Sequence, residues 1–201
     1  VILAGNGYYE LAIDCSDGFA IRKIANRWSA GPGPALDADS GLRVELNGRA
    51  LSGSDFESTG VSVDGHTATI ALKGKTPDNP LVLGITLTID DSPEARLGMS
   101  VANTGNDTIL PQLRFPYLGG VRIDNVDATW VCFPKYRNVI SNQQGYHFAS
   151  NDHAFPMQFM DVYNPSLGVG LALITHNLDH MPIDYAMQKN DAGVTAYIQY
   201  P

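Results

Sequence analysis

Residues 145–180 read GYHFASNDHAFPMQFMDVYNPSLGVGLALITHNLDH, and their pattern predicts the class of fold. A polar, aromatic segment comes first and leads into an apolar run that contains Met157, Phe159 and Met160. The chain turns at Asn164-Pro165-Ser166-Leu167-Gly168 and leaves through a second apolar run, Val169–Ile174. Two strand-sized apolar runs joined by a turn predict a β-hairpin, with a polar aromatic loop leading into it.

Period-two alternation of apolar and polar residues recurs along the rest of the chain. Ile85, Leu87 and Ile89, which alternate with polar residues, form the clearest half-buried strand. The dipeptides Asn47-Gly48 and Asp64-Gly65 are typical of tight hairpin turns. We expect further strands at residues 9–13, 19–24, 42–46, 61–63, 68–72, 96–102, 126–133, 183–188 and 194–200, and loops at 29–40 and 73–80.

Short strands with regular turn residues predict an all-β fold built as an antiparallel β-sandwich or barrel. No segment combines a sustained helical period with capping residues. The chain has 201 residues, which suits one domain spanning residues 1–201.

The charge of the chain excludes some partners. The formal net charge is -8 and only 17% of residues are charged. A nucleic-acid partner requires a basic face, and an anionic membrane surface is disfavoured for the same reason. No apolar run approaches the roughly 18 residues of a membrane helix, so no membrane insertion is expected. The chain begins with Val1 rather than Met, which suggests a processed or excised piece, so the lack of a visible signal peptide does not exclude an original targeting segment.

No metal or cofactor motif is complete in the sequence. Cys15 and Cys132 are far apart, so we expect two buried thiols, with a single disulfide as the alternative. His176 and His180 follow a strand and lack the glutamate of a metalloprotease motif. Residues 37–41, DADSG, begin like a calcium loop but lack its later ligands, and we expect a polar turn. No cofactor is expected.

Aromatic and polar side chains crowd residues 115–163, and this composition suits a carbohydrate. Aromatic faces pack on the apolar patches of sugars, while carboxylates, amides and histidines bond the hydroxyl groups. We expect Phe115, Phe133 and Phe159 to fill the core. The candidate ligand-binding residues are Trp130, Tyr136, Tyr146, His147, Asp152, His153 and Asp161.

No catalytic residue is assigned. Glycoside hydrolysis needs two carboxylates in one cleft, and Asp152 and Asp161 are the nearest candidates by context. Asp161 lies between Met160 and Val162 in a predicted strand, and we expect an Arg or Lys to pair with it. The motifs GxSxG and GxGxxG are absent.

Several short motifs give the chain a family resemblance. FPMQFMDVYNPSLGVGLALITHN at residues 155–177 follows LRFPYLGGVRI at 113–123 and FPKYRN at 133–138. Together with the opening GYYELAIDCSDGFAIRKIAN and the ending AYIQYP, these segments resemble the N-terminal β-supersandwich domain of large bacterial glycoside hydrolases, which has the galactose-mutarotase-like fold.

The resemblance implies a non-catalytic domain of a secreted or periplasmic glycoside hydrolase. The catalytic carboxylates would then lie on a barrel beyond Pro201, and this domain would support that barrel or line its cleft. The partners implied are a carbohydrate and the catalytic domain of the same chain. The alternatives are a free-standing carbohydrate-binding module and a sugar epimerase that uses His147 or His153 as acid or base.

Overall fold

The computed structural model describes residues 1–134, 139–150, 158–176 and 182–200, and nearly all of its regular structure is β-strand. The strands form four antiparallel sheets. Within the described residues no helix is long and apolar enough to cross a membrane. The antiparallel β-sandwich predicted from the turn spacing is therefore confirmed.

Two of the sheets contain most of the N-terminal half of the chain, apart from β4 (Gly41–Leu46) and β5 (Arg49–Ser52). The three-stranded sheet has the order β1 (Ile2–Gly5), β2 (Tyr9–Asp14) and β3 (Ala20–Asn26). The β6–β9 sheet has the order β6 (Phe56–Asp64), β7 (Thr67–Gly74), β8 (Leu81–Ile89) and β9 (Ala95–Asn103).

The other two sheets contain most of the C-terminal half. The six-stranded sheet has the order β13 (Gly145–Ser150), β16 (Asp184–Asn190), β17 (Gly193–Tyr200), β10 (Gln112–Val121), β4 (Gly41–Leu46) and β5 (Arg49–Ser52). The fourth sheet has the order β12 (Val139–Ser141), β11 (Trp130–Phe133), β14 (Phe159–Asn164) and β15 (Val169–Ile174). We call it the β11–β15 sheet, although β13 belongs to the six-stranded sheet.

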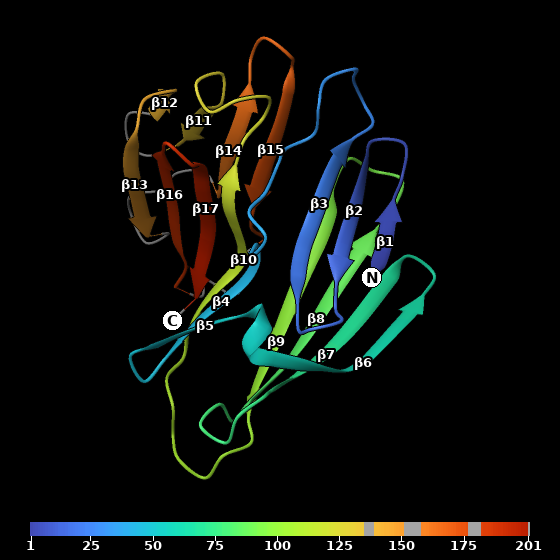
Figure 1. Cartoon of the computed structure of the whole chain (residues 1–201), viewed down its shortest axis with the longest axis vertical. Helices are drawn as coiled ribbons and strands as arrows, with labels where there is room; N and C mark the ends of the chain where they lie inside the picture. The colour runs from blue at the N-terminus through green and yellow to red at the C-terminus, as the bar shows by residue number, and fades with distance from the viewer. Residues whose placement is uncertain (135–138, 151–157, 177–181, 201) are drawn as a thin grey trace.

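The three-stranded sheet packs on the β6–β9 sheet, on the right of Figure 1. Alternate residues of β8, from Leu81 to Ile89, are buried because they face this interior. At one end the Asn6 side-chain amide donates hydrogen bonds of 2.7 Å to the carbonyl oxygens of Asp90 and Ser92. These bonds tie the loop after β1 to the turn after β8.

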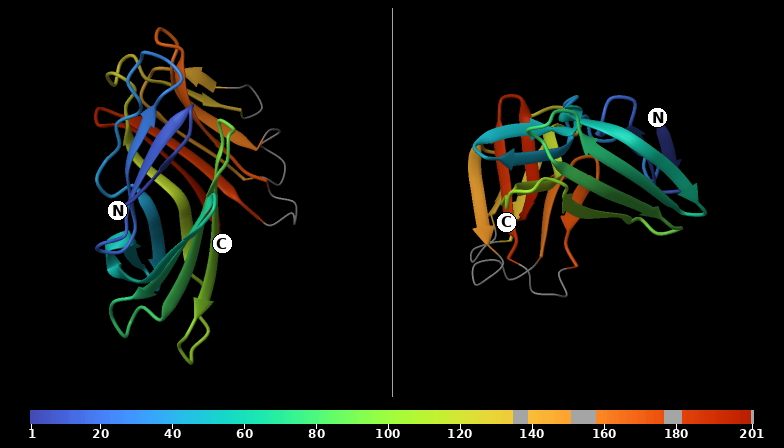
Figure 2. Two further views of the ribbon diagram at one scale, coloured as in Figure 1. Left: turned by 90° about the vertical axis from the view of Figure 1, so that its right-hand side faces the viewer. Right: turned by 90° about the horizontal axis from the view of Figure 1, so that it is seen from below.

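The six-stranded sheet packs on the β11–β15 sheet, and Figure 2 shows this second sandwich beside the first. The rings of Phe133 in β11 and His147 in β13 lie 5.8 Å apart, centroid to centroid, across the interior. The Lys189 ammonium group donates hydrogen bonds to the carbonyl oxygens of Val126, at 2.7 Å, and Thr129. One hydrophobic cluster runs through all four sheets.

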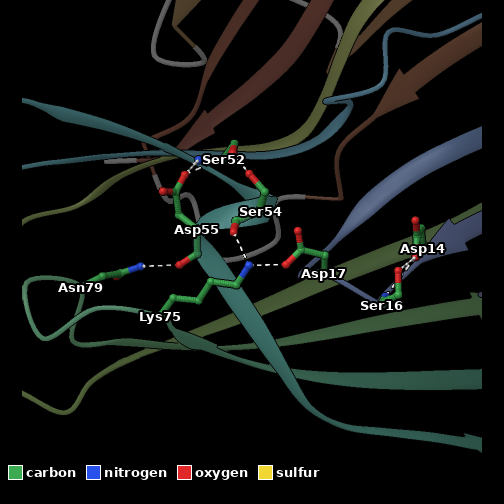
Figure 3. Close-up of polar contacts among 8 residues, drawn as sticks. All are labelled: Asp14, Ser16, Asp17, Ser52, Ser54, Asp55, Lys75 and Asn79. Carbon is green, nitrogen blue, oxygen red and sulfur yellow. Dashed lines mark hydrogen bonds and ion pairs between the residues drawn. The ribbon is translucent and has the colours of Figure 1, made fainter.

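A polar corner joins the sheets where β5 leads through a 3-10 turn, η1 (Gly53–Asp55), into β6 (Figure 3). The Lys75 ammonium group donates to the Asp17 carboxylate and to the Ser54 carbonyl oxygen. The backbone N–H of Phe19 donates to the Gly53 carbonyl oxygen at 3.3 Å. Two loops that are distant in sequence, after β2 and after β7, therefore converge on one short turn.

Several sequence-based boundaries are wrong. The polar aromatic loop expected before the hairpin is in fact strand β13 where it is described, because Gly145–Ser150 pairs with β16. The strand expected at residues 126–133 is limited to β11, since a turn occupies residues 126–128. Strand β10 was not predicted because Pro116 and Gly119-Gly120 interrupt its alternation, and two register shifts accompany them.

The core residues largely follow the prediction. Phe115 and Phe133 are buried, as expected, whereas Phe159 is only half-buried because its strand β14 turns it away from the sandwich interior. Both cysteines are free thiols rather than a disulfide. Cys15 is buried as expected, but Cys132 is half-buried.

Gly53→Ala is expected to destabilise the protein by about 1–3 kcal/mol, the usual cost of forcing the backbone apart in a packed region. An added Cβ at Gly53 would lie 1.8 Å from the Phe19 carbonyl oxygen. Urea denaturation of Gly53→Ala and Gly7→Ala measures the effect, because a Cβ at Gly7 has nothing within 4 Å. Equal unfolding midpoints for the two variants would contradict this account of the corner.

Candidate functional site

The outer face of the six-stranded sheet carries a row of aromatic side chains. Residues directly opposite each other on paired strands point to the same face of a sheet. The pairing places Phe148, Ala186, Tyr197 and Tyr117 in one row across β13, β16, β17 and β10. Tyr146 lies in the adjacent row, opposite Gln188. We call this surface the aromatic face.

Two arginines stack on the tyrosines of the aromatic face. The rings of Tyr117 and Tyr197 are stacked with their centroids 5.9 Å apart. The guanidinium carbon of Arg43 lies 5.0 Å from the centroid of the Tyr117 ring, and that of Arg114 lies 4.9 Å from the centroid of the Tyr197 ring. Such cation–π contacts hold the guanidinium groups flat against the sheet.

A hydrogen-bonded chain continues from Arg114 along the next row. The Arg114 Nε–H donates to Gln199 Oε1 at 3.0 Å, and Gln199 Nε2–H donates to Asp184 Oδ2 at 3.2 Å. The Ser150 hydroxyl donates to Asp184 Oδ1 at 2.6 Å. Each of these side chains is thereby held in a defined orientation beside the rings.

The positive charge of the two arginines is matched by nearby carboxylates. Arg43 forms an ion pair with Asp39, and Arg114 lies 4.0 Å from a carboxylate oxygen of Glu45. Glu45 also lines an open hollow of about 420 Å³ at this end of the sheet, together with Asn47, Gly48, Thr108, Ile109, Leu110 and Gln112. The aromatic face is therefore close to charge-neutral and ends in a polar hollow.

Tyr197 remains a neutral phenol on this face. Burial is the main reason that its pKa rises to about 12, and a hydrogen bond with Tyr146 raises it further, although the charge of Arg114 opposes the rise. A phenol of this kind donates or accepts hydrogen bonds at neutral pH and does not supply a base.

Flat rings beside fixed amide, carboxylate and guanidinium groups can bind a sugar without reacting with it. The rings pack against apolar C–H groups, and the polar chain bonds hydroxyl groups. Of the sequence-predicted residues that the structure describes, Tyr146 alone lies on this face. Its side chain is 57% exposed.

The other predicted site residues that the structure describes, His147, Trp130 and Asp161, lie apart from Tyr146. His147 follows Tyr146 in β13 and therefore points to the opposite side of the sheet, where its ring meets Phe133. Trp130 and Asp161 lie on the outer face of the β11–β15 sheet. Tyr136, Asp152 and His153 lie outside the described residues, so their predicted roles stay predictions.

Sequence reasoning missed Tyr117, Tyr197, Arg43 and Arg114. Arg43 and Tyr197 do alternate with apolar residues in their strands, which marks them as facing away from the core. Only the pairing of β10 with β4 and β17 brings the four side chains together. Their proximity therefore has no signal in the local sequence.

The polar turn expected at residues 37–41 is present, and its carboxylates are paired with arginines. Asp37 lies 3.6 Å from Arg122, and Asp39 pairs with Arg43. In residues 1–134, 139–150, 158–176 and 182–200, no three His, Cys, Asp or Glu side chains are grouped to hold a metal ion. His176 is exposed after β15, and His180 lies outside those ranges.

Asp161 differs from its predicted environment. An Arg or Lys partner was expected, but Asp161 forms no ion pair among the described residues, and its Oδ1 atom is buried without a hydrogen-bond partner. Burial raises the pKa of the Asp161 carboxyl group, although backbone N–H groups of Leu171 and Val162 partly offset this rise. The Oδ1 atom of Asp161 is thus an unsatisfied acceptor on this sheet face.

Comparison with known proteins gives a likeness of fold. No protein-family model matches the chain, and no curated protein sequence matches it. A solved structure, the galactosidase domain of the alpha-galactosidase-sucrose kinase AgaSK, superposes with a TM-score of 0.56 at 8% sequence identity. The match covers 98% of this chain and 36% of that one, so this chain spans about a third of the galactosidase structure.

Asp161→Asn is expected to stabilise the protein at pH 7 by about 1 kcal/mol, the low end of the cost of an unsatisfied buried group, because the side chain is half-buried. A raised pKa means that the folded state holds this proton more tightly than the unfolded state. The destabilisation caused by the ionised Asp161 carboxylate is therefore complete at a pH above its raised pKa. It disappears as the pH falls below the ordinary pKa of an aspartate. Urea denaturation at pH 7 and pH 3 tests this, and a difference that persists at pH 3 would contradict it.

Proposed function

We propose that this chain is a non-catalytic β-sandwich domain of a secreted or periplasmic glycoside hydrolase, and that its aromatic face contacts the carbohydrate. In this proposal the 201 residues form one domain of a longer protein. Its catalytic carboxylates lie on another domain, whose cleft this domain supports or lines.

The observation that carries the proposal is the aromatic face. Four aromatic rings, two stacked guanidinium groups and the Gln199–Asp184–Ser150 chain share one side of one sheet. Rings alone would suit many partners, but fixed donors and acceptors beside them suit a polyhydroxylated ligand. The fold likeness to a galactosidase domain supports the same class of ligand.

A free-standing carbohydrate-binding module is the second candidate. The observation that favours it is the exposure of the stacked pair Tyr146 and Phe148, whose side chains are 57% and 37% exposed. Exposed rings can bind a glycan without a second domain. The epimerase alternative gains no such support from His147, whose ring faces the sandwich interior, and His153 lies outside the described residues.

Tyr146→Ala is expected to weaken glycan binding about tenfold, since loss of an aromatic stacking contact costs on the order of 1 kcal/mol. Isothermal titration of the chain with raffinose, melibiose and maltose measures the affinities. Trp28→Ala is the matched control, because Trp28 is an exposed aromatic residue in the loop after β3, stacked on Tyr8.

The outcome separates the two candidates. Binding by the isolated chain that Tyr146→Ala weakens and Trp28→Ala does not would support the module. If the isolated chain binds none of the sugars, Tyr146→Ala in the full-length protein is expected to raise KM for glycan hydrolysis with little change in kcat. Unchanged affinity and unchanged KM together would overturn a carbohydrate role for the aromatic face.

A further inference from the structure

The outer face of the β11–β15 sheet has an arrangement that the aromatic face does not share. Strand pairing places Cys132 beside Asp161 on one side and Ala172 on the other. Phe159 and Tyr163 lie two residues before and after Asp161 in β14, so their side chains point to the same face. Asp161 therefore lies at the centre of a mainly apolar surface, which we call the Asp161 face.

The side chains around Asp161 are aromatic and aliphatic. Trp130 lies directly opposite Tyr163, and Ile174 lies directly opposite Phe159. Ile140, opposite Cys132, is 57% exposed, and Ile174 is 51% exposed. Asp161 is the one charged side chain in these rows of described residues.

Gly170 leaves the space into which the carboxylate extends. A Cβ built on Gly170 would lie 3.2 Å from Asp161 Oδ1 and 3.5 Å from Oδ2. Because Gly170 has no side chain, the carboxylate can lie across β15 rather than point straight into solvent. Its Oδ1 atom is buried there without a hydrogen-bond partner.

A buried carboxylate oxygen without a donor loses its hydration without compensation. In an apolar surround, the group that best compensates is a single cation with an apolar stem. A metal ion would need further oxygen or nitrogen ligands, which these rows do not supply. A sugar would leave most of its hydroxyl groups against apolar side chains.

We propose that the Asp161 face is a docking surface for a partner protein domain, which inserts an arginine side chain against Asp161 between the rings of Phe159 and Tyr163. The charges are complementary, because the lone carboxylate belongs to a chain of net charge -8. Arginine suits the position better than lysine, since its planar guanidinium group stacks on aromatic rings and donates charge-assisted hydrogen bonds to a carboxylate in one plane. The half-buried Trp130 extends the apolar contact area.

The test uses the chain of 201 residues and the peptide acetyl-Gly-Arg-Gly-amide as the probe. Nuclear magnetic resonance follows the indole N–H signals of the two tryptophans. Trp130 reports on the Asp161 face, and Trp28, in the loop after β3, is an internal reference. The matched peptide with citrulline in place of arginine has nearly the same shape without the charge.

The arginine peptide is expected to shift the Trp130 signal with a dissociation constant on the order of millimolar, and the citrulline peptide is expected to bind roughly tenfold more weakly. Asp161→Asn is expected to remove the same preference, whereas Asp78→Asn, an exposed control, keeps it. The two peptides test the proposal on the unaltered protein even if a variant folds poorly.

Three results would overturn the proposal. They are equal shifts from both peptides, equal binding by the unaltered protein and Asp161→Asn, and a shift of Trp130 by raffinose but not by the arginine peptide. The last result would assign the Asp161 face to carbohydrate. None of these results bears on the aromatic face, which lies on the other sheet of this sandwich.

Discussion

The pairing of β10 with both β4 and β17 is the constraint on which the rest of the structure depends. Strand β10 lies in the middle of the six-stranded sheet and joins strands from opposite ends of the chain. It contributes Phe115, Leu118 and Val121 to the core, while Arg114 and Tyr117 point outward. The closing of the second sandwich and the assembly of the aromatic face therefore follow from the same set of backbone hydrogen bonds.

The two outer faces of the second sandwich differ in how their charges are satisfied. On the aromatic face, Arg43 and Arg114 each stack on a tyrosine ring and have a carboxylate nearby, so both positive charges are compensated. On the Asp161 face, one carboxylate oxygen, Asp161 Oδ1, is buried among apolar side chains without a hydrogen-bond partner. A neutral, polyhydroxylated ligand suits the first face, and a cationic protein side chain suits the second. The two proposed partners would thus bind opposite sides of one sandwich.

Close backbone packing at the polar corner fixes how the two sandwiches are joined. Gly18 has a φ of +95°, a conformation that residues with a side chain rarely adopt, and it packs directly on Gly53. Lys75 and Asp17 add an ion pair over this contact. Because the corner connects β5 to β6, its geometry fixes the orientation of the β6–β9 sheet relative to the six-stranded sheet. Steric fit at the corner contributes more to stability than the exposed ion pair.

The sequence by itself determined the fold class and many of the strands, because period-two alternation and turn dipeptides such as Asn47-Gly48 and Asp64-Gly65 act over a few residues. It also predicted the burial of Phe115 and Phe133. Only the tertiary structure decided which side chains share a face. Tyr146 and His147 are neighbours in the chain but lie on opposite sides of β13, while Arg43 and Arg114 meet across a strand pair. Local sequence encodes alternation, whereas long-range strand pairing selects the neighbours, and a site depends on neighbours.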